Sequence, residues 1–351
     1  MTAGLFGFLS QFGLLGLAIV GIIAWVRDWP RGKAYAWLAT VWLGGLVSSW
    51  LRHDTEAAAG YVRLWIAVGL IGLVAAIYGE GVRWLRRRTR AAPVAAPASG
   101  GFRAAELDRY ARHIILREIG GPGQQRLKAA KVLVVGAGGL GSPVLLYLAA
   151  AGVGVIGMID DDVVEGSNLQ RQVIHTDGRI GMPKVFSAEV AMRALNPFIE
   201  VRPYHRRLTG EIAVDLIRGY DLVLDGTDDF DTRYLVNQAC VAAGVPLISG
   251  AIAQWEGQVS LFHPAKGTPC YACVFPVKPA PGLVPTCAEA GVAAPLPGVI
   301  GSIMAMEAVK WITGAGEGLA GRLMIHDALY GETRVIGAKR RADCEVCGAR
   351  H

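Results

Sequence analysis

Charged residues are scarce in this chain. Asp, Glu, Lys and Arg make up 18% of the 351 residues, whereas hydrophobic residues make up 52%. The mean hydropathy of +0.37 is high for a soluble enzyme, in which about 25% of residues are charged. We therefore expect part of the chain to lie in lipid.

The larger part of the chain also lacks a net basic charge. The formal charge of +6 comes from residues 1–105, which hold 11 Lys and Arg against 4 Asp and Glu. The remaining residues hold 24 against 25 and are close to neutral. A protein that binds the phosphate backbone of nucleic acids is expected to carry a basic face on its globular domain. The charge distribution therefore argues against a nucleic-acid partner.

Ionisable residues are absent from the interior of three long apolar runs near the N-terminus. The runs predict transmembrane helices at about 4–26, 34–51 and 64–82,. A signal peptide fits poorly, because no basic segment precedes the first run and two further runs follow it. The lack of intramembrane charge gives no support to a transport function. Residues 1–88 are therefore interpreted as an all-α membrane anchor.

Basic residues around these runs set the expected orientation. One side of the membrane would carry Arg27, Arg31, Lys33, Arg83, Arg86, Arg87, Arg88 and Arg90. The opposite side would carry only Arg52 and Arg63. Because the more basic side faces the cytoplasm, we expect a multi-pass protein of the cell (inner) membrane with a cytoplasmic C-terminal domain. Trp50, Trp65 and Trp84 lie near the ends of the runs, either as interfacial anchors or as packing residues between helices.

The rest of the chain has the pattern of a linker and one enzyme domain. Residues 89–105 are rich in Ala, Pro and Gly without apolar periodicity, which predicts a flexible linker,. From 106 to 351, buried strands alternate with helical segments. This alternation predicts an α/β domain with a mostly parallel sheet and helices on both faces. Strands are expected at "KVLVVG", "VGVIGMID", "IEVRPYHRR", "YDLVLDGTDD", "VPLISG" and "GQVSLFHP".

A glycine-rich loop follows the first expected strand. Gly136, Gly138 and Gly141 fit the pattern G-x-G-x-x-G, and Gly139 lies between them. Such glycines allow a tight turn, close approach to phosphate and a helix N-terminus that binds it, as in Rossmann-like folds. Asp160 follows the last glycine by 19 residues, so it is expected to take the ribose hydroxyls of a nucleotide,.

The segment "SNLQRQ" suggests a nucleotide with more charge than a dinucleotide. Cleavage of a triphosphate at the α-phosphate needs positive groups on the departing pyrophosphate, which Arg171 and Lys184 are able to supply,. Asn168 and Gln170 are candidates for hydrogen bonds to phosphate or ribose oxygens. Taken alone, Arg171 and Lys184 would be better explained as solvated loop cations.

Four acidic residues come at the end of the strand "YDLVLDG" and just after it: Asp225, Asp228, Asp229 and Asp231. Asp228 follows the carboxyl end of a parallel strand, where it could hold a Mg²⁺ ion that bridges phosphate oxygens. The alternative is that these acids cap the next helix. For Asp231, directly before "TRYLVNQ", an N-cap is the preferred interpretation,.

Six cysteines in a chain whose main domain is placed in the cytoplasm argue against disulfides,. Two C-x2-C pairs, Cys270 with Cys273 and Cys344 with Cys347, are typical of a closed structural Zn²⁺ site with four thiolates,. Cys240 is interpreted as a buried core thiol.

Many ordered segments together resemble the ubiquitin-activating-enzyme-like adenylyltransferases that include HesA, MoeB and ThiF, and within them the MoeB type. The resemblance covers residues from about 106 to 348. It is carried by "RYARHIILREIG", "VLVVGAGGLGSPVLLYLAAAGVG", "SNLQRQ", "GMPK", "DLVLDGTDD", "WEGQVSLF", "CYAC", "TCAEAGVAAPLPGVIGSIMAMEAVK" and "CEVC".

The resemblance implies ATP-dependent adenylation of the C-terminal glycine of a small ubiquitin-like sulfur carrier, MoaD-like or ThiS-like and ending in Gly-Gly. Pyrophosphate would be released, and a separate sulfurtransferase or cysteine desulfurase would supply sulfur for a thiocarboxylate in molybdopterin or thiamine-type biosynthesis. It also implies that Asp160 binds ribose, that Arg171 and Lys184 contact phosphates and that Asp228 holds Mg²⁺. Arg112 would reach the neighbouring subunit's ATP site, which implies a homodimer.

Three positions need comment beside the resemblance. By the resemblance, Cys287 lies in the crossover loop, here about 277–295. Some relatives use a cysteine there to form a covalent bond with the carrier, and MoeB-like proteins can have the cysteine without that use. Asp229, counted here among the nucleotide-binding residues, stands where many members have Asn. Gln254 stands where many have Arg. No rhodanese-like segment follows "CEVCGARH", so sulfur is expected from another protein.

Three other functions compete with this interpretation. An NAD-dependent oxidoreductase would explain the glycines and Asp160 but leaves "SNLQRQ", Lys184 and the cysteine pairs without roles. A relative acting on a different carboxylate, such as tRNA threonylcarbamoyladenosine dehydratase, shares the nucleotide site, but the neutral domain weighs against tRNA. A non-catalytic membrane-tethered module is disfavoured because all five charged site residues are present: Arg112, Asp160, Arg171, Lys184 and Asp228.

Overall fold

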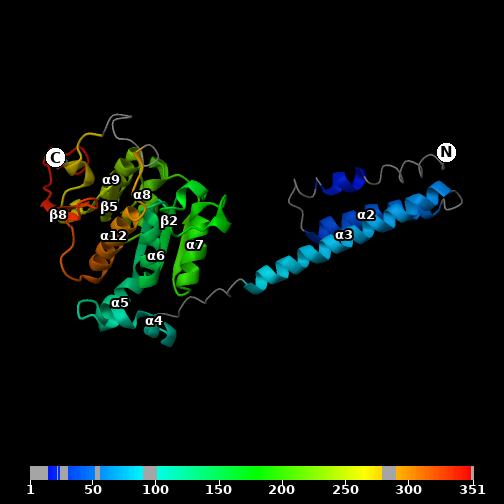
Figure 1. Cartoon of the computed structure of the whole chain (residues 1–351), viewed down its shortest axis with the longest axis horizontal. Helices are drawn as coiled ribbons and strands as arrows, with labels where there is room; N and C mark the ends of the chain where they lie inside the picture. Colours follow the sequence, from blue (N-terminus) through cyan, green and yellow to red (C-terminus); the bar gives the residue numbers. More distant parts are fainter. Residues whose placement is uncertain are drawn as a thin grey trace. The chain divides into compact units, whose positions relative to one another are not determined.

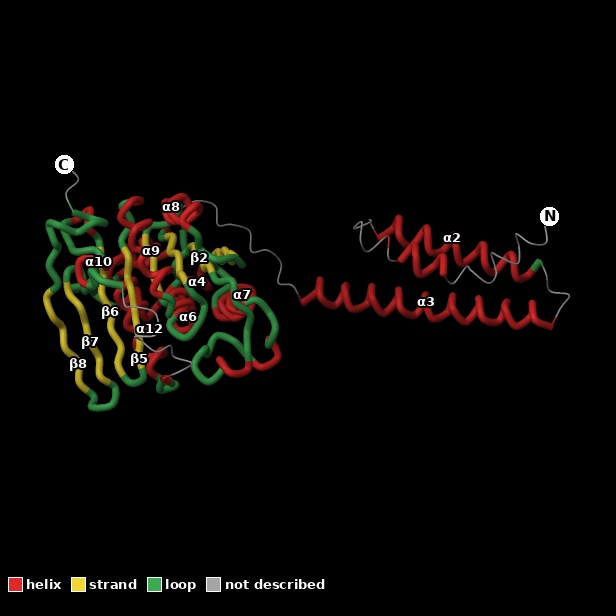
Figure 2. Tube along the Cα trace, turned by 90° about the horizontal axis from the view of Figure 1, so that it is seen from above, coloured by secondary structure: helices red, strands yellow, loops and turns green. Residues whose placement is uncertain are grey.

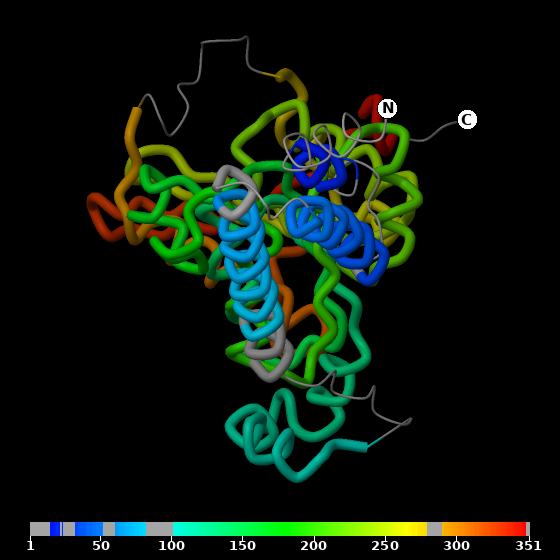
Figure 3. Tube along the Cα trace, turned by 90° about the vertical axis from the view of Figure 1, so that its right-hand side faces the viewer, coloured from blue at the N-terminus to red at the C-terminus, as the bar shows by residue number. Residues whose placement is uncertain are grey.

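The computed structural model describes residues 15–21, 23, 31–51, 56–89, 101–278 and 290–348. The chain divides into two compact units, Met1–Pro93 and Val94–His351. In the first unit, helices α2 (Arg31–Trp50) and α3 (Glu56–Thr89) pack side by side (Figures 1 and 3). Helix α3 has 34 residues and continues one residue into the segment that was predicted as a linker.

The three-helix transmembrane segment is corrected to one apolar helix within the described residues. The segment Gly60–Gly81, with 22 residues and a mean hydropathy of 1.9, is long and apolar enough to cross a membrane by length and composition only. The run predicted at 34–51 is helical, but Trp, Tyr, Thr and Ser between its aliphatic residues leave it less apolar. The run predicted at 4–26 falls largely outside the described residues.

Glycine and tryptophan pair reciprocally where α2 meets α3. The ring of Trp65 is fully buried and lies where a Cβ on Gly45 would be 2.4 Å away. The ring of Trp42 lies against Gly69 in the same way, at 2.5 Å from an added Cβ. The indole Nε1 of Trp42 donates a 2.7 Å hydrogen bond to the Trp65 carbonyl. Of the two roles considered for Trp65, packing between helices is therefore the one that the structure shows.

The second unit is built on one sheet of eight strands in the order β3-β2-β1-β4-β5-β6-β7-β8. The strands from β3 to β5 in this order are parallel, and β6, β7 and β8 are antiparallel additions (Figure 2). The strands are β1 (Lys131–Val135), β2 (Val155–Ile159), β3 (Glu200–Tyr204), β4 (Leu222–Asp225), β5 (Leu247–Ala253), β6 (Glu256–Phe262), β7 (Arg322–Asp327) and β8 (Glu332–Gly337). The predicted α/β fold is confirmed, whereas β7 and β8 were not predicted.

Helices cover both faces of this sheet, as predicted (Figure 1). They are α4 (Ala104–Ile115), α5 (Gly120–Ala129), α6 (Gly141–Ala151), α7 (Lys184–Leu195), α8 (Gly210–Arg218), α9 (Phe230–Ala243), α10 (Tyr271–Val274) and α12 (Leu296–Thr313), with short turns η1 (Gly166–Asn168), η2 (Asp177–Arg179) and η3 (Pro264–Lys266). Helices α5, α6, α7 and α12 pack on one face and α8, α9 and α10 on the other.

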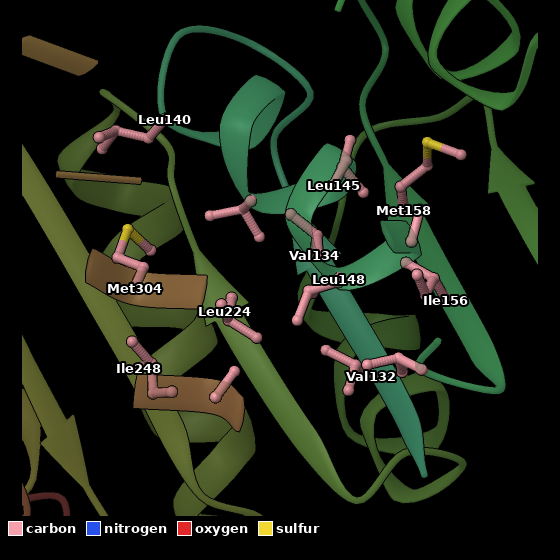
Figure 4. Close-up of a cluster of buried hydrophobic side chains, with 14 of the residues drawn as sticks. Val132, Val134, Leu140, Leu145, Leu148, Ile156, Met158, Leu224, Ile248 and Met304 are labelled. Carbon is pink, nitrogen blue, oxygen red and sulfur yellow. The ribbon is translucent and has the colours of Figure 1, made fainter. Parts of the chain in front are cut away.

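Strand β1 shows why the sequence forms a two-faced core. Its residues are apolar without interruption, as expected of a parallel strand that is covered on both sides. Val132 and Val134 contact the face that carries α6 and α12, and Figure 4 shows them among Leu145 and Leu148 of α6. The alternate residues of β1 contact the face that carries α8 and α9. This core fixes the carboxyl ends of the strands, where the polar residues gather.

Candidate active site

A cavity of about 740 Å³ opens at the carboxyl ends of β1 and β4. These neighbouring strands lead to helices on opposite faces, so the strand order reverses between them, and ligands of open α/β sheets bind at such a point,. The cavity runs from the loop after β1, past the loop after β4, to β5 and β6. Its volume lies in the usual range for small-molecule sites, about 300–1,000 Å³.

The glycine-rich loop forms one wall of this cavity. Gly136 has a φ of 91°, a conformation that favours glycine,. A Cβ on Gly141, the first residue of α6, would lie 2.0 Å from the Gly136 carbonyl oxygen, so this close turn excludes any side chain there. Gly138 and Gly139 line the cavity. Within the described part of the chain, their backbone N–H groups have no acceptor, which leaves them available to an anion at the N-terminus of α6,.

Asp160 follows β2 and is held by two backbone groups. Its Oδ2 accepts a 2.7 Å hydrogen bond from Ala137 N, and its Oδ1 accepts one of 2.9 Å from Asp162 N. Burial raises the pKa of the Asp160 carboxyl, and the hydrogen bond from Ala137 and the charge of Lys184 offset only part of that effect. Asp160 lines the cavity beside the glycine loop, as expected of a ribose-binding carboxylate.

The two predicted cations, Lys184 and Arg171, both line the cavity, and a polar neighbour holds each of them. The Nζ of Lys184, the first residue of α7, is buried and lies 2.7 Å from the Asp162 carboxylate. Arg171 lines the cavity and donates a 3.0 Å hydrogen bond from NH2 to Asn168 Oδ1. Asn168 itself does not line the cavity, so it contacts the nucleotide region through Arg171. Gln170 is exposed and also lies outside the cavity lining.

The acidic residues after β4 do not all take the positions that the sequence predicted. Asp228 is exposed and lines the cavity. The N-cap of α9 is Asp229 and not Asp231, because the Asp229 carboxylate accepts hydrogen bonds from Asp231 N at 3.3 Å and Thr232 N at 3.0 Å. Asp231 instead forms an ion pair with Lys278.

The charge of this cap is stabilised within the loop. Partial burial alone would raise the pKa of Asp229. The hydrogen bonds from Thr232 and Asp231 and the positive charge of Arg207, 3.2 Å away, outweigh burial and lower that pKa. Asp229 also lines the cavity. The residue that caps α9 is therefore also part of the cavity wall.

Sequence reasoning missed a buried ion pair behind this loop. Arg233 of α9 lies 3.8 Å from the Asp225 carboxylate, and both side chains are almost fully buried. The guanidinium also donates hydrogen bonds to Ser249 Oγ at 3.1 Å and to the Thr227 carbonyl. The pair therefore fixes the backbone that leads to Asp228. The sequence did not mark Arg233 as a site residue, because it lies within a segment that was predicted only as a helix.

Gln172 was also missed, although it belongs to the quoted segment "SNLQRQ". It is 4% exposed, lines the cavity, and its Oε1 has no hydrogen-bond partner within the described residues. Arg206, Arg207 and Lys278 add further positive charge to the lining. No local signal in the sequence separates Gln172 from Gln170, which is exposed and outside the cavity lining.

One predicted catalytic residue lies outside this cavity and another is not described. Arg112 is exposed on α4 and does not line it. Cys287 lies outside the described residues, so its role stays a prediction. Gln254 is exposed in the two-residue turn between β5 and β6, with a φ of 45°, and is also outside the lining.

The four paired cysteines gather at a separate place. The Sγ atoms of Cys270 and Cys344 are 3.6 Å apart, those of Cys273 and Cys347 3.4 Å, and those of Cys270 and Cys273 3.8 Å. All four side chains are buried. Four thiolates around Zn²⁺ at about 2.3 Å would be separated by roughly 3.7 Å, so the observed spacing fits a tetrahedral zinc site. Cys240 is buried away from this cluster, as predicted.

Comparison with known proteins agrees with this arrangement. The ThiF family matches residues 110–346, more than half of the chain. The chain belongs to the ThiF family. The predicted membership in the HesA, MoeB and ThiF group is thereby confirmed.

Relatives of this ThiF-family chain match most of its length. The sulfur carrier protein adenylyltransferase of Thermus thermophilus is 53% identical over 247 residues, covering 69% of this chain and 91% of the relative. The SAMP-activating enzyme E1 of Haloferax volcanii is 48% identical over 245 residues, covering 70% and 90%. A crystal structure of E. coli MccB with MccA-N7isoASN has a TM-score of 0.62 at 25% identity, covering 69% of this chain and 75% of that one.

Proposed function

We propose that this chain is an adenylyltransferase that uses ATP to activate the C-terminal glycine of a small ubiquitin-like sulfur carrier. The observation that carries the proposal is the cavity that the glycine loop, Arg171 and Lys184 line together. The amides of Gly138 and Gly139 in this loop have no acceptor among the described residues. The Thermus relative, 53% identical, is named for this reaction. The product, a carrier acyl-adenylate, is the activation step for thiocarboxylate formation in molybdopterin or thiamine-type biosynthesis.

The reaction needs positioning and charge stabilisation more than proton transfer. The carrier's terminal carboxylate is already an anion, so it attacks the α-phosphate without a general base, and pyrophosphate leaves with the electron pair of the broken bond. The amides at the start of α6, Arg171 and Lys184 stabilise the phosphate charges. Asp160 binds the ribose hydroxyls. Asp228 is suited to Mg²⁺, which takes one or two protein carboxylates beside substrate phosphates and would neutralise charge on them.

The far end of the cavity suits the tail of the carrier. The cavity continues over β5 and β6, where Ala251, Ala253 and Gly257 are small lining positions among larger ones from the same strands: Ile252, Glu256 and Gln258. A Cβ on Gly257 would lie 2.3 Å from the Ile300 side chain, so packing beneath the strand keeps this position small. An extended Gly-Gly segment, which has no side chains, would fit beside these small positions.

The sharpest test of the function is ATP–pyrophosphate exchange by the full chain in detergent, with each Gly-Gly-ending small protein of the host. We expect exchange only when one carrier is present. ATP binding without exchange on any carrier would favour another carboxylic acid as substrate. Binding of NAD in place of ATP would overturn the proposal.

We also propose that the four-cysteine cluster holds a structural Zn²⁺ ion. Zinc there would tie residues 344–347 to the loop at 270–273 and would supply no reacting group,. Metal analysis of the purified chain should give one zinc per chain.

A homodimer is proposed from the position of Arg112. This residue is exposed and outside the cavity of its own subunit, as expected of a group that serves a neighbouring site. Mixing the inactive Arg112→Ala and Asp228→Ala proteins, after exchange of subunits, tests the idea. Each mixed dimer would hold one complete site, so exchange activity should return to about a quarter of the wild-type value. Activity that does not return would contradict a shared site.

Membrane attachment is proposed for the first unit, with the second unit in the cytoplasm. The α3 segment Gly60–Gly81 has 6% of its most apolar window buried, so its aliphatic side chains need an apolar environment,. We expect the full chain in the membrane fraction after alkaline carbonate washing, and we expect protease added to inverted vesicles to remove the second unit. Release of the intact chain by carbonate would contradict insertion.

We propose that a separate sulfurtransferase or cysteine desulfurase carries out the sulfur transfer.

A further inference from the structure

His175 lies behind the glycine loop and belongs to none of the groups described above. It is 5% exposed, between η1 and η2. Its Nε2 is 2.9 Å from the Ala137 carbonyl oxygen, and its Nδ1 is 2.9 Å from Ser187 Oγ. A carbonyl only accepts hydrogen bonds, so Nε2 carries the proton and Nδ1 accepts from the Ser187 hydroxyl. Burial, together with the charges of Lys184 and Arg179, lowers the pKa of His175 and favours this neutral form.

The bond to Ala137 determines where the next amide points. The peptide between Ala137 and Gly138 is planar and trans, so its carbonyl and its N–H point in opposite directions. Because the carbonyl points to His175, the Gly138 N–H points away from it. Gly138 lines the cavity, and its N–H has no acceptor among the described residues. The preceding peptide is fixed separately, because Ala137 N donates to Asp160.

The imidazole is itself held on its other side. Ser187 is fully buried on α7, and its Oγ receives a 3.3 Å hydrogen bond from Arg179 NH1. The Nε of Arg179 donates to Thr176 Oγ1 at 3.0 Å. The helix that supplies Lys184 to the cavity therefore also carries the support of His175. Rotation of the ring would break two hydrogen bonds inside a closed network.

We propose that His175 is a positioning residue that aims the Gly138 N–H at the phosphate chain of the nucleotide. This inference rests on the proposed use of ATP. His175 does not touch the nucleotide and acts through the Ala137–Gly138 peptide. Its removal therefore weakens binding of phosphates and leaves the nucleoside contacts of Asp160 in place.

Two matched substitutions separate this role from simple packing. His175→Gln places an amide nitrogen near the position of Nε2 and keeps the bond to Ala137. His175→Asn reaches only the position of Nδ1 and leaves the Ala137 carbonyl without its donor. The dissociation constants of ATP and adenosine are measured by calorimetry on the full chain in detergent, with thermal stability and zinc content as checks of folding.

We expect His175→Asn to bind ATP about tenfold more weakly, with adenosine affinity within about twofold, because one phosphate contact loses its orientation. His175→Gln should bind both ligands within about twofold of the wild type. Equal weakening of ATP and adenosine by His175→Asn, unchanged ATP binding, or failure of His175→Gln to restore it would overturn the proposal.

A third variant keeps the test decisive if His175→Asn does not fold. Ser187→Ala leaves the Ala137 bond but frees the ring, so ATP affinity should fall about threefold with adenosine affinity unchanged. An equal loss for the two ligands would count against the proposal.

Measurements on the wild type separate the proposed function from the positioning role of His175. ATP binding without carrier-dependent exchange would contradict the proposed function alone, whereas no ATP binding would contradict both.

Discussion

The helix pair α2–α3 exposes the kind of side chain that the α/β unit buries. Ile71 and Val74 of α3 are 70% and 66% exposed, while Trp65 of α3 and Ser48 and Ser49 of α2 are almost completely buried. In β1, by contrast, the valines and leucine have exposures of 2% or less. A helix pair in water gains stability by burying its aliphatic stripe, but in lipid that gain disappears and close packing of small residues takes over.

The contrast shows that burial alone does not define a core. Reciprocal packing of tryptophan on glycine holds α2 to α3, and a continuous aliphatic layer holds the sheet to its helices. The two units are therefore expected to respond independently to substitution, each according to the solvent around it. Four substitutions, three of them paired with a second variant for comparison, test the two units.

The largest effect is expected for Asp228→Ala in the second unit. Loss of the carboxylate that is suited to Mg²⁺ should reduce ATP–pyrophosphate exchange by about 10³-fold, since charge stabilisation at a transferring phosphoryl group carries most of the catalysis. Zinc content and the carbonate-resistant membrane fraction should not change. Retained exchange would remove Asp228 from the magnesium role, and loss from the membrane would contradict the independence of the units.

Cys344→Ser should release zinc and lower the melting temperature of the second unit by about 10 °C, equivalent to a few kcal/mol for a domain of this size. Cys240→Ala is the matched control, because Cys240 is buried but outside the cluster. It should keep its zinc. Metal analysis and thermal unfolding check both variants. Zinc retained by Cys344→Ser at wild-type stoichiometry would argue against four-thiolate binding.

Val74→Asp tests the first unit directly. If α3 lies in lipid, a carboxylate there costs about 2.5–3.5 kcal/mol near the middle of the span and should shift protein out of the carbonate-resistant fraction. Tyr330→Asp is the control, because Tyr330 is 78% exposed in the second unit. This control should leave the membrane fraction unchanged. An equal effect of the two variants on the carbonate-resistant fraction would contradict the placement of α3 in lipid.

The smallest effect is expected at the N-cap of α9. Asp229→Ala should destabilise the second unit by about 1 kcal/mol, whereas Asp229→Asn should retain most of the stability because Asn also caps helices. The folded-state pKa of Asp229 is lowered, so its charge contributes stability above the ordinary carboxyl pKa that is lost as pH falls through the lowered value,. The difference in melting temperature between wild type and Asp229→Asn should therefore begin to shrink as the pH falls below about 4 and should vanish only below the lowered pKa. A difference that does not shrink over this acid range would rule out the charge as its cause.

Much of the second unit was predictable because its signals are local. The uninterrupted apolar strand before Gly136, the glycine spacing and the acid after β2 each follow from short stretches of sequence. The two cysteine pairs predicted a cluster across 70 residues because few arrangements other than a metal site explain such spacing,.

What the sequence did not predict depends on contacts between distant segments. The buried pair of Asp225 and Arg233 and the bond from His175 to Ala137 join residues from different elements. Whether Asp229 or Asp231 is the N-cap depends on the residue at which α9 begins. That residue can shift by two positions without a change in the apolar pattern of the sequence. Strand β8 was missed because it is an exposed edge strand with a charged and mixed sequence,.

The tryptophan of the α2–α3 seam has a spectroscopic consequence. Seven of the nine tryptophans precede residue 94, and Trp65 is the fully buried one among those whose side chains are described. Intrinsic fluorescence of the whole chain therefore reports mainly on the first unit. An emission shift during a detergent or lipid titration would follow the helix pair without any label, while events at the nucleotide cavity would need a separate optical probe.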